Sequence, residues 1–277
     1  MSATQEIAFE QADRVGEGRS AEVFADRSGR IIKLYKAKWG KSLAEKEFAA
    51  TSFAYSHGLR VPAALGIIER DGRTGVIFEH IHGKTVLEQF NRSPLGMLGA
   101  LRQLAHIQHS IHKVEKPPLP SQQDAIRIQV LRARVPPWLK QTTLAVLDRL
   151  PDGDRLCHGD LHPENVLHTS NGLVVIDWEK STSGHPAADV ARTDLIIRSG
   201  RVGKTRTLRR AASRIIRKAL AEFYIWQYCR LSMISREDVM AWRLPMLVAR
   251  LSGQVATNEH EIQAEASELG TQFAHLI

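Results

Sequence analysis

Short stretches in which apolar and polar residues alternate dominate the first third of the chain. Alternation of this kind is typical of strands that bury one face, and Asp71 and Gly72, between the last two stretches, favour a tight hairpin turn. One helical pattern, at residues 41–55, interrupts the series. The pattern therefore predicts an antiparallel sheet accompanied by one helix. The expected strands are residues 7–15, 31–35, 64–68 and 75–79.

After residue 90 the apolar residues recur every three or four positions, which is the period of helices with one buried face. Pro136 and Pro137 separate two of these patterns, because proline interrupts the interior of a helix. In the longest pattern the expected buried stripe includes Ile215 and Ile216. The second part of the chain is therefore predicted to be mainly helical. The expected helices are residues 93–111, 124–134, 138–150 and 205–231.

The composition of the 277-residue chain is ordinary for a globular protein, with 43% hydrophobic and 25% charged residues. We find no signal-peptide pattern and no apolar run near the roughly 20 residues that a membrane span needs. Cys157 and Cys229 lie too far apart for a metal-binding motif, so we expect reduced thiols in a cytoplasmic protein. The net charge of +8 is compatible with an anionic partner and equally with simple solubility.

Chemically competent residues concentrate in residues 157–167, which hold a histidine, an aspartate and an asparagine. Phosphoryl transfer from a nucleotide needs a carboxylate facing the attacking hydroxyl and oxygen ligands that hold Mg²⁺ on the phosphates. A loop carrying Asp160 and Asn165, followed by a hairpin that ends at Asp177, supplies groups of these types. Each residue alone is a weak signal, because such residues often cap turns. The combination predicts phosphoryl transfer.

This pattern resembles the aminoglycoside phosphotransferase and choline-kinase-like family of small-molecule kinases, with His-Gly-Asp at residues 158–160 and Ile-Asp-Trp at residues 176–178. The resemblance implies a bilobal, protein-kinase-like fold of the α/β (α+β) class. Residues 1–82 would form a nucleotide-binding N-lobe with an antiparallel sheet. Residues 83–277 would form a helical C-lobe. The implied activity is ATP-dependent phosphorylation of a small-molecule hydroxyl.

The resemblance also assigns roles to the residues of the motif. Asp160 would be the catalytic base or would orient the acceptor hydroxyl, and His158 would shape the catalytic loop. Asn165 and Asp177 would hold Mg²⁺. In the related segment at residues 184–192, Asp189 would brace the catalytic loop by hydrogen bonds.

Gly16 and Gly18 lie in a segment that resembles a kinase glycine-rich loop, with Ala21 in place of the third glycine. Two glycines two residues apart let the backbone turn and approach phosphate oxygens, and Ser20 offers a hydroxyl and an amide to a phosphate. A plain hairpin turn would give the same pattern. The position of the segment before a strand that contains a lysine favours the phosphate loop.

Lys33 is expected on the same strand face as Ile31 and Tyr35. In kinases the equivalent lysine binds the nucleotide phosphates and is held by a glutamate from a helix. Glu45 and Glu47 are the candidates on the expected helix, and we favour Glu47 because of its distance from Val61 and Pro62.

Residues 79–83 break the last strand and resemble the hinge of the family, where adenine contacts main-chain groups. Glu79 would supply a carbonyl and Ile81 an amide, and Phe78 would form the back wall of the pocket. His80 and His82 resemble a metal-binding pair, but no third ligand is near in the sequence, so we expect no metal there.

A basic run at residues 198–218 is expected near the acceptor site, whereas several acidic residues lie after residue 236. Either group could face the acceptor. We expect a neutral or anionic acceptor in preference to a polycationic aminoglycoside.

Three other functions are compatible with parts of the pattern. An atypical protein kinase would use the same machinery, but His162 stands where protein kinases often carry lysine. A nucleotide-binding pseudokinase that regulates a partner would not need the full catalytic set. A nucleic-acid-binding module would need a recognition motif, and we find none.

Overall fold

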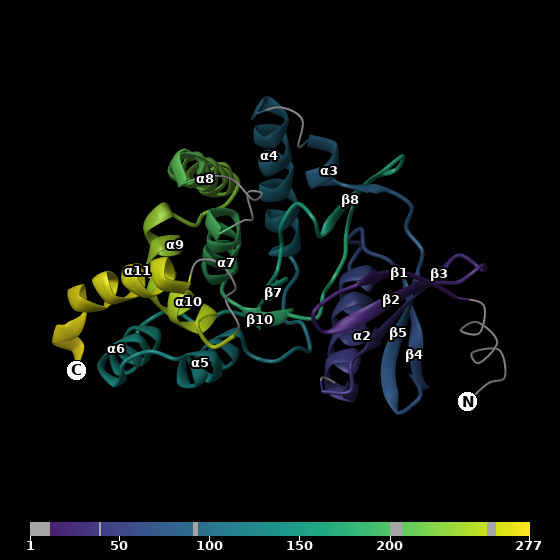
Figure 1. Cartoon of the computed structure of the whole chain (residues 1–277), viewed down its shortest axis with the longest axis horizontal. Coiled ribbons are helices and arrows are strands. Elements are labelled where there is room, and N and C mark those ends of the chain that lie inside the picture. Colours follow the sequence, from purple (N-terminus) through teal and green to yellow (C-terminus); the bar gives the residue numbers. More distant parts are fainter. Residues whose placement is uncertain (1–11, 39, 91–93, 200–206, 254–258) are drawn as a thin grey trace. The chain divides into compact units, whose positions relative to one another are not determined.

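The computed structural model describes residues 12–38, 40–90, 94–199, 207–253 and 259–277 (Figure 1). The chain forms two compact units. The first comprises the residues up to Gln89 together with Pro117–Leu119 and Pro163–Ser181, and the second comprises the remainder. The lobe boundary expected after residue 82 stays a prediction. In the described ranges, no helix is long and apolar enough to span a membrane.

A five-stranded antiparallel sheet forms the centre of the first unit, with the strand order β1-β2-β3-β5-β4. The first strand begins later than the alternation predicted, and residues 7–11 of the expected strand lie outside the described residues. The hairpin between β4 and β5 is the predicted one. Its turn has φ of 49° at Asp71 and 70° at Gly72, the two positive values that a type I′ turn needs. The strands are β1 Asp13–Glu17, β2 Ala21–Ala25, β3 Arg30–Tyr35, β4 Ala64–Arg70 and β5 Arg73–Glu79.

Helix α2 (Gly40–Ser56) packs on β5, β4 and β3 of this sheet (Figure 1). Its buried residues recur at helical spacing, and Ala44 joins a core cluster with Tyr35, Val76 and Phe78 of the sheet. Because Glu47 lies three residues after Ala44, it falls on the same buried face of the helix. The helix therefore carries a carboxylate to the sheet.

The rest of the first unit is a three-stranded sheet in the order β6-β8-β9, together with a short helix. Strands β8 and β9 form the hairpin that the sequence predicted before Asp177. The elements are β6 Lys84–Thr85, α3 Val86–Phe90, β8 Val166–Thr169 and β9 Gly172–Val175.

The second unit is mainly helical, as expected, and α7 packs against both α8 and α10 (Figure 1). A short two-stranded sheet pairs β10 with β7, which ends directly before His158. The three helices α9, α10 and α11 were not anticipated. The elements are α4 Pro94–Ile111, α5 Gln122–Arg132, α6 Pro137–Leu147, β7 Arg155–Cys157, β10 Thr182–Gly184, α7 Pro186–Ser199, α8 Thr207–Cys229, α9 Arg236–Ala241, α10 Arg243–Arg250, α11 Glu259–Gln272 and a 3₁₀ turn, Ala274–Leu276.

The expected buried stripe of helix α8 is wrong at two positions. Ile215 and Ile216 are 69% and 58% exposed. The face that packs into the unit lies nearer the C-terminal end of the helix. Its buried residues, at the spacing of a helical stripe, are Ala221, Tyr224, Ile225 and Tyr228.

Candidate active site

Lys33 extends from strand β3 toward helix α2, where its ammonium lies 3.0 Å from a carboxylate oxygen of Glu47. The alternation of the strand explains the direction, because Lys33 shares its face with Tyr35, whose hydroxyl also bonds to Glu47. Glu45 lies on the exposed face of the helix, 3.8 Å from Lys41. The structure therefore pairs Lys33 with Glu47.

Two further carboxylates from the segment after β9 surround the same ammonium. Asp177 approaches Lys33 Nζ to 2.6 Å and Glu179 to 3.5 Å. Burial lowers the pKa of Lys33, but the three carboxylates outweigh burial and raise the pKa above its ordinary value. Burial raises the pKa of Glu47 to about 7, although the Lys33 charge opposes the change. Three carboxylates thus share one cation.

The backbone of Asp177 is in the left-handed region, with φ of 66°. Such a conformation costs a non-glycine residue about 1–3 kcal/mol and persists only where the surroundings hold it. A bond of 3.0 Å from the Ile176 amide to the Asn165 carbonyl fixes the preceding residue. This bond also brings Asn165, which is buried, beside the segment that carries Asp177. The geometry turns the Asp177 carboxylate toward Lys33.

The loop between β1 and β2 contacts the same carboxylate group. The Ser20 hydroxyl donates a hydrogen bond of 2.7 Å to Glu179, and the Gly18 amide donates one of 2.8 Å to the Ala21 carbonyl. Gly16 and Gly18 do not adopt positive φ. A Cβ added at Gly18 would lie 3.5 Å from the Ala21 carbonyl oxygen, an ordinary contact. The tight turn itself therefore does not require these glycines.

Strand β5 ends at Glu79, and residues 80–83 follow it without regular secondary structure. The Glu79 amide donates to the Ala63 carbonyl over 2.9 Å, and the His80 amide donates to the Gly29 carbonyl over 3.0 Å. These bonds anchor the start of the segment to the sheet. Beyond them, Ile81 and its neighbours line a cavity of about 420 Å³, together with residues of the β8–β9 turn.

In the second unit, Asp160 lies in a loop whose backbone is hydrogen-bonded to Asp189 of helix α7. The Asp189 carboxylate accepts hydrogen bonds from the His158 amide over 3.1 Å and from the Gly159 amide over 2.8 Å. Gly159 has φ of 75°, a value that favours glycine, and the Asp160 amide donates to His158 Nδ1 over 3.2 Å. The histidine and the buried aspartate thus fix the backbone on which Asp160 stands.

Two residues that the sequence reasoning missed complete this network. Gln108 Nε2 donates to Asp189 over 2.9 Å, and His112 Nε2 lies 3.1 Å from the same carboxylate. Burial would raise the pKa of Asp189, but these partners, His112 first, hold it at about 2. His112 is buried, whereas His106, six residues earlier, is exposed. Its position at the end of α4 gives no signal in the sequence alone.

Residues 12–223 match the model of the family described as "Phosphotransferase enzyme family". The chain belongs to this phosphotransferase family. The match covers every expected site residue, from Gly16 to Asp189. The expected family is confirmed.

Solved structures support the expected fold of the phosphotransferase. A ternary complex of a thermostable mutant of aminoglycoside phosphotransferase APH(4)-Ia with ADP and hygromycin B superposes with a TM-score of 0.62 at 15% identity, over 100% of this chain and 99% of that one. An amicoumacin kinase, hAmiN, in complex with AMP-PNP, Ca²⁺ and Ami gives a TM-score of 0.64 at 12% identity, over 98% of this chain and 92% of that one. The mixed α/β, kinase-like fold is confirmed.

A curated protein, "Acyl-CoA dehydrogenase family member 11" from Pongo abelii, is 35% identical over 65 residues. This segment covers 21% of the phosphotransferase and only 8% of that protein. The chain therefore corresponds to a small part of this relative.

Proposed function

We propose that this phosphotransferase moves the γ-phosphoryl group of ATP to a hydroxyl of a small molecule. The observation that carries the proposal is the group of three carboxylates around Lys33. A lysine held by a helix glutamate, next to an aspartate that follows a short hairpin, is the arrangement that positions nucleotide phosphates in kinases. Solved proteins of this fold bind ADP or AMP-PNP together with hygromycin B or amicoumacin.

Residues of the first unit would bind the nucleotide. Lys33 would exchange its bond to Asp177 for bonds to the phosphates, while Glu47 keeps the ammonium in place. The amides of the loop at Gly16, Gly18 and Ser20 would contact phosphate oxygens. At the hinge, the Glu79 carbonyl and the Ile81 amide would bind adenine, since the Glu79 and His80 amides are already engaged by the sheet.

The residues present fit a magnesium ion. Carboxylate oxygens of Glu47, Asp177 and Glu179 lie within 4.8 Å of one another, and Lys33 alone does not neutralise them. We assign Asp177 and Asn165 as the Mg²⁺ ligands, because carboxylate and amide oxygens are the hard donors that this ion prefers. When bound, Mg²⁺ would neutralise charge on the phosphates.

Asp160 would act as the base. Its carboxylate takes the proton of the acceptor hydroxyl while the acceptor oxygen bonds to the γ-phosphorus, and the bond from that phosphorus to the β–γ bridging oxygen breaks to release ADP. His158 and Asp189 would position Asp160 through the loop backbone.

The acceptor would be neutral or anionic. Arg214 and Lys218, in the described part of the basic run, are exposed. Arg198, at its start, is engaged by Asp194 and Glu222. Arg201, Lys204 and Arg206 lie outside the described residues. Support for this charge preference therefore has to come from residues outside the run.

We also propose a cytoplasmic location. Cys157 and Cys229 are both free thiols, and burial raises the pKa of each. Cysteines that persist unpaired are typical of reducing compartments.

A panel of acceptors tests the activity. Purified protein with ATP and Mg²⁺ is incubated with neutral polyols, hydroxy acids, sugar phosphates and aminoglycosides, and ADP release and acceptor mass are measured. We expect ADP and a product heavier by one phosphate, with Asp160→Asn as the inactive control. ADP without a phosphorylated acceptor in any arm would contradict transfer to small molecules.

A further inference from the structure

Two arginines of the second unit have a buried guanidinium nitrogen that no described residue bonds. Arg192 lies on α7, and Arg250 is the last residue of α10. The Nε atom of each is buried and has no hydrogen-bond partner among the described residues. Neither side chain forms an ion pair within that part of the chain. A guanidinium N–H that loses water without gaining an acceptor is destabilising, so this arrangement favours an anion.

The backbone places Arg192 beside the catalytic loop. On α7, Asp189 binds the amides of His158 and Gly159, and the Thr193 hydroxyl donates to the Leu161 carbonyl over 3.1 Å. Arg192 lies three residues after Asp189, on a neighbouring part of the same helix face. It therefore stands next to the turn of helix that holds the segment on which Asp160 lies.

Arg250 belongs to the same charged group. Helix α10 packs on α7, and Arg243 of α10 bonds to Asp194 of α7 over 2.5 Å. Burial lowers the pKa of Arg250, the charge of Arg192 lowers it further, and only Asp160 acts in the opposite direction. Arg192, Arg250 and Asp160 are thus close enough to influence one another, with two positive charges against one negative charge.

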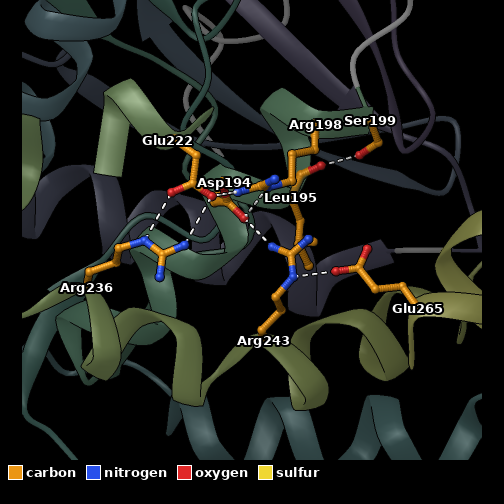
Figure 2. Close-up of polar contacts among 8 residues, drawn as sticks. All are labelled: Asp194, Leu195, Arg198, Ser199, Glu222, Arg236, Arg243 and Glu265. Atoms are coloured by element: carbon orange, nitrogen blue, oxygen red, sulfur yellow. Dashed lines mark hydrogen bonds and ion pairs between the residues drawn. The ribbon is translucent and has the colours of Figure 1, made fainter. Parts of the chain in front are cut away.

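Two other arginines of the same helices form ion pairs with carboxylates of the chain. Arg198 of α7 bonds to Asp194 and Glu222, and Arg243 of α10 bonds to Asp194 and Glu265 (Figure 2). Each of these guanidiniums faces carboxylates that the chain itself provides. Each helix therefore carries one arginine that is paired with carboxylates. Its other arginine, Arg192 on α7 or Arg250 on α10, has no such ion pair among the described residues.

We propose that Arg192 and Arg250 bind an anionic group of the acceptor, a carboxylate or a phosphate, beside the hydroxyl that Asp160 deprotonates. The inference rests on the proposed function and adds the chemical class of the substrate. Planar guanidinium groups bind carboxylates and phosphates through paired hydrogen bonds, which gives both affinity and orientation.

Anion binding by the nucleotide-loaded enzyme tests the proposal without the natural acceptor. Inorganic phosphate and acetate are titrated by calorimetry into protein saturated with AMP-PNP and Mg²⁺, so that the nucleotide phosphate sites are filled. We expect at least one of the two anions to bind wild type, and Arg192→Gln or Arg250→Gln to weaken that binding at least tenfold, as expected when a charged hydrogen-bond partner is lost. Arg236→Gln, which changes an exposed arginine of the same unit, should leave it unchanged.

Thermal unfolding separates binding from folding. Without added anion, Arg250→Gln should have a Tm equal to or above that of wild type, since it removes an uncompensated charge. With phosphate or acetate, whichever binds, only wild type and Arg236→Gln should gain stability. A lower Tm for Arg250→Gln without anion would assign the arginine a structural role and overturn the proposal.

The nucleotide could be a second source of the anion. If Arg192→Gln or Arg250→Gln weakens AMP-PNP at least tenfold while ADP binding is unchanged, the pair binds the γ-phosphate, and the acceptor assignment is wrong. Absence of phosphate and acetate binding to wild type, or equal binding by wild type and both variants, would also overturn it. AMP-PNP binding and ATP turnover by wild type report on the proposed function separately, so failure of one proposal is distinguishable from failure of the other.

Discussion

The ion network around Asp194 in the second unit and the group around Lys33 in the first are both built from partly buried charges, but only one is balanced. The network pairs three carboxylates with three guanidinium groups (Figure 2). Around Lys33, three carboxylates meet a single ammonium. Removing a charge from water is unfavourable unless a partner compensates it. A balanced network can therefore serve stability alone, whereas an imbalance indicates a ligand of the opposite sign.

By the same reasoning, the excess charge at Arg192 and Arg250 is opposite in sign to the excess around Lys33. Their excess is positive and lies near Asp160, whereas the excess around Lys33 is negative. We therefore expect a cation to complete the first unit and an anion to complete the second. Each of the following predictions removes one charged side chain.

The largest effect is expected at Asp160, the negative charge beside the arginine pair. Asp160→Asn should lower kcat by about 10²–10⁴-fold, because the base that accepts the hydroxyl proton is lost. AMP-PNP affinity should change less than about twofold, because Asp160 lies outside the groups assigned to the nucleotide. Steady-state kinetics and calorimetry measure the two quantities. Activity equal to wild type would remove Asp160 from the mechanism.

Removal of Arg243 should break the balanced network. Arg243→Gln leaves the buried carboxylate of Asp194 with one cation fewer, and loss of one partner of a buried ion pair costs about 3–5 kcal/mol. The free energy of unfolding in urea measures the loss. Arg250→Gln on the same helix is the matched control and should lose no stability. Equal losses in the two variants would show that the charge balance does not distinguish these positions.

The lowered pKa of Asp189 predicts that the stability of the protein depends on pH. Its pKa is held at about 2, below the ordinary value of 3.8, so its contribution to stability is present above pH 4 and is lost as the pH falls toward 2. The difference corresponds to about 2 kcal/mol. Urea unfolding of wild type and Asp189→Asn at pH 6 and at pH 3 checks this contribution. Asp189→Asn should be less stable at pH 6, and the gap should narrow at pH 3. A gap independent of pH would contradict the ionised state of Asp189.

The smallest effect is expected at the rim of the balanced network. The side chain of Arg236 is 53% exposed and lies 3.1 Å from Glu222. Water screens such pairs, so Arg236→Gln should cost less than about 1 kcal/mol of unfolding free energy, and less again in 1 M salt. A loss as large as that of Arg243→Gln would contradict the distinction between rim and buried charges.

Local patterns explain which parts of the site could be predicted from the sequence. Strand alternation was sufficient to place Lys33 on the face of Tyr35, and the distance of Glu47 from Val61 and Pro62 was sufficient to favour it over Glu45. The hairpin before Asp177 and the brace from Asp189 follow from motif order. These features depend on residues close in the sequence or on a pattern that the family shares.

The missed features depend on long-range packing. Glu179 meets Ser20 across 159 residues, and Gln108 meets Asp189 across 81 residues. Helix α8 has apolar residues on more than one face, so periodicity alone could not indicate that Ile215 and Ile216 are exposed. Arg192 and Arg250 are ordinary surface arginines in the sequence. Only their buried Nε atoms, which have no hydrogen-bond partner among the described residues, set them apart.

The Mg²⁺ dependence of nucleotide binding tests most directly whether the negative group around Lys33 is a nucleotide–metal site. Calorimetry measures AMP-PNP affinity with and without Mg²⁺ for wild type and for Asp177→Asn, with Arg236→Gln as control. We predict that Mg²⁺ tightens AMP-PNP binding to wild type and to the control, and that Asp177→Asn abolishes the tightening because the carboxylate that holds the ion is lost. An equal effect of Mg²⁺ on wild type and Asp177→Asn, or no binding of AMP-PNP to wild type, would contradict the assignment.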